Sequence, residues 1–114
     1  MDKRRALMQE RVSALTFEQL LRILDYDNEF LLDDCNYRDG KFCPLAVAFN
    51  LHETVSNPSD DIIRDEIVRI GNAQIPDFAI NPTKGIQGTF YTTNRRDDLM
   101  ELVTTEIARR ANLL

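Results

Sequence analysis

The sequence predicts a single α+β domain over residues 1–114, in which four or five helices pack around a small antiparallel sheet. Three observations support this fold class. Apolar residues recur at helical spacing in several segments, an Asp-Gly dipeptide separates two short runs typical of a hairpin, and a later run is rich in β-branched and aromatic residues. We expect a mainly helical chain with a hairpin over about 30–43 and a strand over about 89–93. A parallel sheet is not expected, because too few strands alternate with helices.

The N-terminal segment is predicted to be helical. Over 3–14 and the adjoining Leu15, one arginine and four apolar residues recur at spacings of three and four: Leu7, Met8, Arg11, Val12 and Leu15. Thr16 followed by Gln19 has the form of a capping box and predicts the start of a stronger helix. The apolar face of that helix contains Phe17, Leu20, Leu21 and Leu24. The two segments fit either one kinked helix or two helices.

A tight hairpin followed directly by a buried helix is predicted next. Asp39-Gly40 favours a two-residue turn, which pairs Tyr37 with Phe42 and Asn36 with Cys43. Pro44 suits the first turn of a helix, and the residues after it are apolar all round, so this helix should be central. We expect it to continue through His52, which would place His52 about 13 Å along the axis from Cys43 and on the opposite face.

The C-terminal half should contain two more helices. Ser59 can cap a helix with Asp60 and Asp61 in its first turn and an apolar stripe of Ile62, Ile63, Ile67 and Ile70. We expect that helix to end at Gly71-Asn72 and a long connecting loop to occupy 73–88. After the strand over about 89–93, Asn94 should start a terminal helix whose apolar residues repeat at three and four: Leu99, Met100, Val103, Ile107, Ala111 and Leu114.

Composition points to an intracellular, cytoplasmic protein. Apolar residues make up 43% and charged residues 29% of the chain, which is typical of a folded globular domain. No apolar run approaches the roughly 20 residues that span a bilayer, so no membrane association is expected. The two cysteines should be reduced thiols without a disulfide, because the N-terminus lacks the apolar core of a signal peptide.

The formal charge of −5 is unevenly distributed: residues 1–24 sum to +2, residues 25–52 to −4, residues 53–94 to −3 and residues 95–114 to 0. Binding to a phosphate backbone requires clustered Lys and Arg, so nucleic acid is not an expected partner. We interpret Lys3-Arg4-Arg5 and Arg95-Arg96 as solvated helix ends.

Spacing argues against a metal site and against a cofactor. Cys35, Cys43 and His52 form C-x7-C-x8-H, which lacks the short knuckle that brings two sulfurs to one zinc ion. Residues 25–29 carry acidic groups at calcium-loop positions 1, 3 and 5, but Phe30 and Asn36 occupy the positions that require Gly and Glu. We interpret this acidic stretch as a solvated surface and expect no cofactor.

Cys43 is the candidate nucleophile of the chain. A thiol at a helix N-terminus loses its proton more easily than a free thiol, which is a common property of reactive cysteines. A nucleophile also needs a base, and His52 is expected on the opposite side. A redox pair with Cys35 is disfavoured by the two-residue turn, which places the cysteines on opposite faces of the hairpin. A three-residue loop would bring them to one face, so the pairing depends on the register.

The run 39–47, DGKFCPLAV, resembles a motif in small, mostly uncharacterised phage and prophage proteins that reads roughly D-G-x-F-C-C-L-G-V-L after an apolar helix. The resemblance covers about fifteen residues and implies a hairpin that leads directly into a buried helix. It also implies a phage or mobile-element origin, and hence the cytoplasm of an infected host cell. Pro44 and Ala46 depart from the motif, so no role of the cysteine pair is carried over. The resemblance implies no activity.

Three functions remain open. The first is a non-catalytic accessory domain that binds a protein or associates with itself, for which the apolar end of the terminal helix, 111–114, offers a surface. The second is a small-ligand-binding protein or minor enzyme with its site between the hairpin and the 73–88 loop. That site would contain Tyr37, Arg38, Asp39, Cys43, Tyr91 and Arg95. The third is an acidic mimic of nucleic acid, which requires rows of carboxylates within 25–66.

Overall fold

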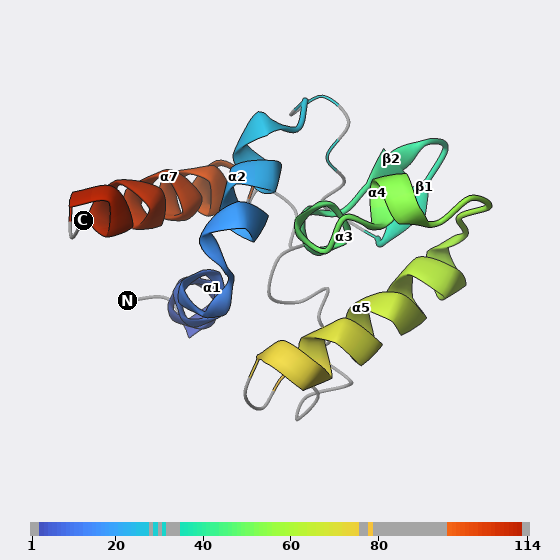
Figure 1. Ribbon diagram of the computed structural model, residues 1–114, viewed down its shortest axis with the longest axis horizontal. Coiled ribbons are helices and arrows are strands. Elements are labelled where there is room, and N and C mark those ends of the chain that lie inside the picture. The colour runs from blue at the N-terminus through green and yellow to red at the C-terminus, as the bar shows by residue number, and fades with distance from the viewer. Residues whose placement is uncertain are drawn as a thin grey trace.

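The computed structural model describes residues 3–27, 29, 31, 35–75, 78 and 96–112. Within these residues the chain forms six helices and one two-stranded antiparallel sheet, shown in Figure 1. The prediction of a mainly helical α+β fold is therefore confirmed. The strand predicted over about 89–93 and most of the loop predicted over 73–88 lie outside the described residues.

The helices are α1 (Lys3–Ala14), α2 (Phe17–Asp25), α3 (Pro44–Ala48), α4 (Leu51–Thr54), α5 (Asp60–Gln74) and α7 (Arg96–Asn112), and the strands are β1 (Tyr37–Arg38) and β2 (Lys41–Phe42). The N-terminal segment thus forms two helices. The capping box separates them: the Gln19 amide donates to Thr16 Oγ1 over 3.1 Å, and the Thr16 amide donates to Gln19 Oε1 over 2.9 Å. These two bonds satisfy backbone donors that a helix start would leave unpaired.

The hairpin has the predicted turn and the predicted register. Asp39 and Gly40 adopt φ values of 50° and 81°, as a turn with two left-handed residues requires. Tyr37 pairs with Phe42, and the backbone N–H of Cys43 donates to the carbonyl of Asn36 over 3.1 Å. Each strand has only two residues, so the sheet is much shorter than the predicted hairpin over about 30–43.

Helix α3 lies at the centre of the molecule, between α2, α4 and α5 (Figure 1). All five of its residues are buried, which confirms the central helix predicted after Pro44. Arg22 of α2 donates from Nη1 to the carbonyl of Ala48 over 2.9 Å and so satisfies one acceptor at the C-terminal end of α3. The largest fully buried side chains of the core are Met8, Leu15, Leu20, Ile23, Leu31, Leu45, Ile63, Ile67 and Leu99, with Val12 and Val47.

The prediction that this helix continues through His52 is wrong. Helix α3 ends at Ala48, and Asn50 takes a left-handed conformation with φ 64° before α4 begins at Leu51. Asparagine tolerates this conformation better than most residues. The chain therefore changes direction between Cys43 and His52, and their separation along one helix axis, inferred from sequence, does not apply.

Helix α5 is longer than predicted and is capped as predicted. Ser59 Oγ accepts from the amide of Ile62 over 3.2 Å. Gly71 does not end the helix. It is buried inside it, against the ring of Phe78, where a Cβ atom would lie 2.3 Å from Cε1. The predicted apolar stripe is also too wide, because Ile63 and Ile67 are fully buried whereas Ile62 is 46% exposed.

Two glutamine side chains join the ends of three helices, α1, α2 and α5. The side-chain amides of Gln19 and Gln74 bond to each other, with Gln19 Nε2 donating to Gln74 Oε1 over 2.8 Å. Gln74 Nε2 also donates to the carbonyl of Ala14. The start of α2, the end of α1 and the end of α5 therefore meet through one pair of glutamines.

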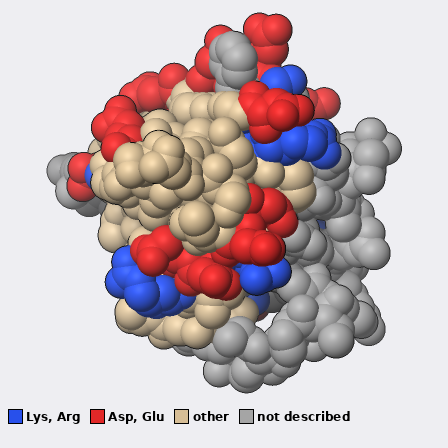
Figure 2. Space-filling view, turned by 90° about the vertical axis from the view of Figure 1, so that its right-hand side faces the viewer, with Lys and Arg blue, Asp and Glu red and all other residues tan. Residues whose placement is uncertain are grey.

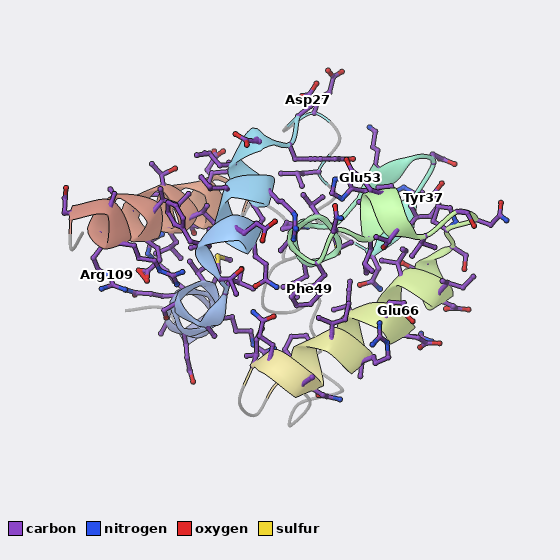
Figure 3. All side chains as sticks on the ribbon, viewed as in Figure 1. Asp27, Tyr37, Phe49, Glu53, Glu66 and Arg109 are labelled. Carbon is purple, nitrogen blue, oxygen red and sulfur yellow. The ribbon has the colours of Figure 1, made fainter. Side chains whose placement is uncertain are left out.

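Helix α7 packs against α1 and α2. Arg5, predicted to lie at a solvated helix end, instead pairs with Asp98 over 2.9 Å and with Glu101 over 3.1 Å. One turn from the end of α7, Arg109 and Arg110 both donate to Glu106, and these hydrogen bonds lower the pKa of its buried carboxyl. Figure 3 shows Arg109 beside α1 at this end of the molecule. The predicted cap, Asn94, lies outside the described residues.

Replacing Gly71 with Ala should destabilise the protein, because the new methyl group overlaps the Phe78 ring, which is held by the Arg11 guanidinium 4.5 Å from its centroid. Overpacking of this kind costs about 1–3 kcal/mol, more than the helix gains from removing a glycine. Urea unfolding would measure the loss. Asn72→Ala, at the exposed neighbouring position, is the control and should not lose stability. Equal stability of the two variants would contradict the close packing of Gly71.

Candidate functional site

The residues predicted to form a pocket at the hairpin do not share one environment. Tyr37 is half-buried, with its ring 4.9 Å from that of Phe42, whereas Arg38 and Asp39 are exposed at the turn. Tyr91 and Arg95, the predicted contributors from the far side of the loop, lie outside the described residues. Of the six predicted residues, the structure therefore places Tyr37, Arg38, Asp39 and Cys43 along the hairpin.

Cys43 caps the central helix. Its Sγ accepts a hydrogen bond from the amide of Ala46 over 3.2 Å, and the residue is fully buried. Cys43 and Cys35 do not form a disulfide with each other, and Cys35 is half-buried before β1 with its Sγ directed to the carbonyl of Tyr37 over 3.7 Å. A reactant in solvent has no access to Cys43 in this conformation, so the thiol acts structurally at the helix N-terminus predicted for it.

Asp60, expected only to stabilise the first turn of its helix, also anchors the hairpin. Asp60 Oδ1 accepts from the amide of Asn36 over 2.8 Å and from that of Tyr37 over 3.2 Å. The side chain of Asn36 is completely buried, and neither its Nδ2 nor its Oδ1 has a hydrogen-bond partner. The contact joins the start of α5 to β1. No local pattern signals it, because the bonded residues are 23 and 24 positions apart.

His52 lies in a row of aromatic rings. Its ring is 5.2 Å from that of Tyr26, the residue that caps the end of α2, and 6.2 Å from that of Phe42 of β2, edge-on to both, and its Nδ1 is buried without a partner. Burial lowers the pKa of His52; Glu53 opposes this shift and Arg22 adds to it. The neutral ring is therefore the form that the fold stabilises.

Part of the predicted apolar face of α2 is exposed to solvent. Leu20 and Ile23 are fully buried, but Phe17 is 40% exposed and Leu24 is 39% exposed, and Leu21 between them is half-buried. These last three side chains lie roughly a quarter of a turn around the helix from the buried pair. We call Phe17, Leu21 and Leu24 the α2 flank.

Carboxylates cluster at the C-terminal end of α2. Asp25 is its last residue, and Asp27 and Glu29 follow it, all three exposed. Figure 3 shows Asp27 pointing away from the body of the molecule. No cation among the described residues forms an ion pair with these three groups, whereas Glu18, nearer the start of α2, pairs with Arg22 over 2.8 Å. A helix C-terminus carries partial negative charge, so acidic groups are unfavourable there.

Arginines pair with three of the carboxylates along α5, Asp61, Asp65 and Glu66. Figure 2 shows the end of the molecule formed by the hairpin, α4 and the start of α5, where acidic side chains border an uncharged surface and alternate with basic ones. Arg64 pairs with Asp61 and Asp65, and Arg69 pairs with Glu66 over 2.6 Å. These pairs break up the row of carboxylates along α5.

Comparisons with protein families, with curated proteins and with solved structures found no match to this chain. Among the described residues, no three His, Cys, Asp or Glu side chains gather as ligands of a metal ion would. None of the described helices is long and apolar enough to cross a membrane.

Alkylation in the folded state should distinguish the two cysteines. Cys43 is fully buried, so it should react only when α3 opens, whereas the half-buried Cys35 should react in the native protein. The Cys35→Ser and Cys43→Ser variants assign each rate by mass spectrometry. Native Cys43 labelled as fast as a free thiol would contradict the cap.

Stability should fall as the pH drops through about 6.5, the ordinary pKa of histidine. The folded state holds the pKa of His52 below that value, so the unfolded chain takes up the proton first and unfolding is favoured until the folded group also titrates. The free energy of unfolding at pH 7.5 and 5.5 measures the effect. His52 is the chain's single histidine, so His52→Gln should show a smaller loss, and equal losses would refute this assignment.

Proposed function

We propose that this chain is a non-catalytic protein-binding module that docks its partner on the α2 flank. The observation that carries this proposal is the exposure of Phe17 and Leu24 on one side of one helix, with half-buried Leu21 between them. Scattered exposed apolar residues are ordinary, but a contiguous apolar strip bordered by charge is typical of an interaction surface.

The spacing of these residues supports docking along the helix. Positions 17, 21 and 24 differ by four and three residues, so the side chains form one row about 10 Å long on α2. The capping box fixes the first turn beneath Phe17, and Arg22 anchors the opposite side of the helix to α3. The row is therefore presented by a helix held at both its start and its middle, which limits the entropy lost on binding.

The other two functions have less support from the described residues. The thiol of Cys43 is buried and caps α3, so the predicted site by the hairpin lacks an accessible nucleophile among them. An acidic mimic of nucleic acid requires unbroken rows of carboxylates, and arginines interrupt the row along α5.

Replacing two residues of the α2 flank should remove binding without unfolding the protein. Phe17→Gln with Leu24→Gln changes partly exposed side chains, so we expect little loss of stability, about 1 kcal/mol in total. The matched control is Ile62→Gln, which removes the third large apolar side chain that is exposed among the described residues, on a different helix.

Two measurements read out the effect. Light scattering gives the mass in solution, and quantitative capture on immobilised protein from an extract of the source cells gives the retained partners. Wild type and Ile62→Gln should retain the same partner or the same dimer mass, and Phe17→Gln/Leu24→Gln should lose it. Identical results for all three proteins would show that the α2 flank is not the docking face.

A further inference from the structure

We infer that the partner of the α2 flank is a basic amphipathic helix whose cationic residues gather at one end of its apolar stripe. This inference rests on the proposed function, which assigns docking to α2. It adds the chemistry of the occupant, and two features of α2 carry it: the row of apolar side chains and the carboxylates beyond the end of that row.

The apolar row determines the shape of the partner. Phe17, Leu21 and Leu24 form a row nearly parallel to the axis of α2, and apolar rows at this spacing of four and three pack against the apolar stripe of a second helix. Recognition of an amphipathic helix uses anchors at the same spacing. A partner helix of three turns would cover the row from the capped first turn to Leu24.

The carboxylates determine the charge of the partner. Asp25 directly follows Leu24 as the last residue of α2, at the negative end of the helix dipole; Asp27 and Glu29 come next in the chain, and no described cation pairs with any of the three. An acidic group in the last turn of a helix is unfavourable in the free protein. Lysine or arginine side chains from a partner would offset that effect, so these groups favour a basic occupant.

The same charges disfavour a second copy of this chain. Residues 16–29 contain four acidic groups and one arginine, a net charge of −3. Two copies of α2 packed face to face would bring like charges together, which lowers both the rate and the affinity of association. A separate basic helix meets the same surface with opposite charge.

Three synthetic peptides of about 18 residues, long enough to form helix on binding, test the inference. All three share leucines spaced as on the α2 flank. They differ at one end, where the basic peptide carries lysine and arginine, the acidic peptide carries glutamate and the neutral peptide carries glutamine. Fluorescence anisotropy gives the affinity of each at about 50 mM and about 300 mM salt. We expect the basic peptide to bind best, to bind more weakly at the higher salt, and to lose binding to Phe17→Gln/Leu24→Gln.

The variant Asp25→Asn/Glu29→Gln separates a binding role from a structural one. It should lower the affinity for the basic peptide by about two- to threefold for each carboxylate removed. It should also raise the melting temperature of the free protein by about 2–5 °C, because it removes repulsion at the end of α2. The control Asp39→Asn/Glu53→Gln removes two exposed carboxylates elsewhere and should change peptide affinity little.

The outcomes separate this inference from the proposed function. If all three peptides bind equally well and Phe17→Gln/Leu24→Gln abolishes their binding, the α2 flank remains the docking face, but the inference that the partner is basic is wrong. If the wild-type protein binds no peptide but forms a dimer that Phe17→Gln/Leu24→Gln dissociates, the occupant of the α2 flank is a second copy. That result would overturn the inference and leave the proposed function standing. A monomer that binds no peptide would overturn the inference, and it would overturn the proposed function as well if wild type and Phe17→Gln/Leu24→Gln retain the same proteins from the extract. A lower melting temperature for Asp25→Asn/Glu29→Gln would overturn the argument from repulsion.

Discussion

The burial of α3 is the constraint on which the rest of the structure depends. All five residues of this short helix are inaccessible to solvent, so other elements must surround it. Its first turn is fixed by the Cys43 cap and by the backbone bond from Cys43 to Asn36, and its last carbonyl is held by Arg22. The hairpin and α2 are thus tied to opposite ends of one buried helix, and α5 joins them because Asp60 binds the first strand.

Features that depend on neighbouring residues were predicted well from the sequence. The Asp39-Gly40 turn, its register and the capping box each follow from two to four adjacent residues whose conformational preferences agree. Contacts between distant residues were not predicted. Glycine near the end of an apolar stripe favours a helix end, and the packing of Gly71 against Phe78 leaves no local pattern that argues otherwise. The left-handed conformation of Asn50 has no local signal either, because asparagine adopts it mainly where tertiary contacts favour it.

The candidate site shows the same division between local and distant information. The periodicity of apolar residues indicates which face of α2 is apolar and how wide it is. It does not indicate how much of that face other elements cover. The exposed part, Phe17 and Leu24, was recognised only once α3 and α7 were placed against the buried part. The sequence also shows the acidic stretch after Leu24, but only the structure shows that it begins at the C-terminus of α2, where negative charge is unfavourable.

The paired glutamines have a consequence for how this sequence can change. Gln19 Oε1 accepts from the Thr16 backbone and from Gln74, while its Nε2 donates to Gln74. Glutamate at position 19 would keep the capping box, but its second carboxylate oxygen would replace the Nε2 that now donates to Gln74 Oε1, and two acceptors would face each other. We therefore expect descendants of this chain to keep both glutamines or to replace both. Replacing only one of them removes a hydrogen-bond partner of the other side-chain amide.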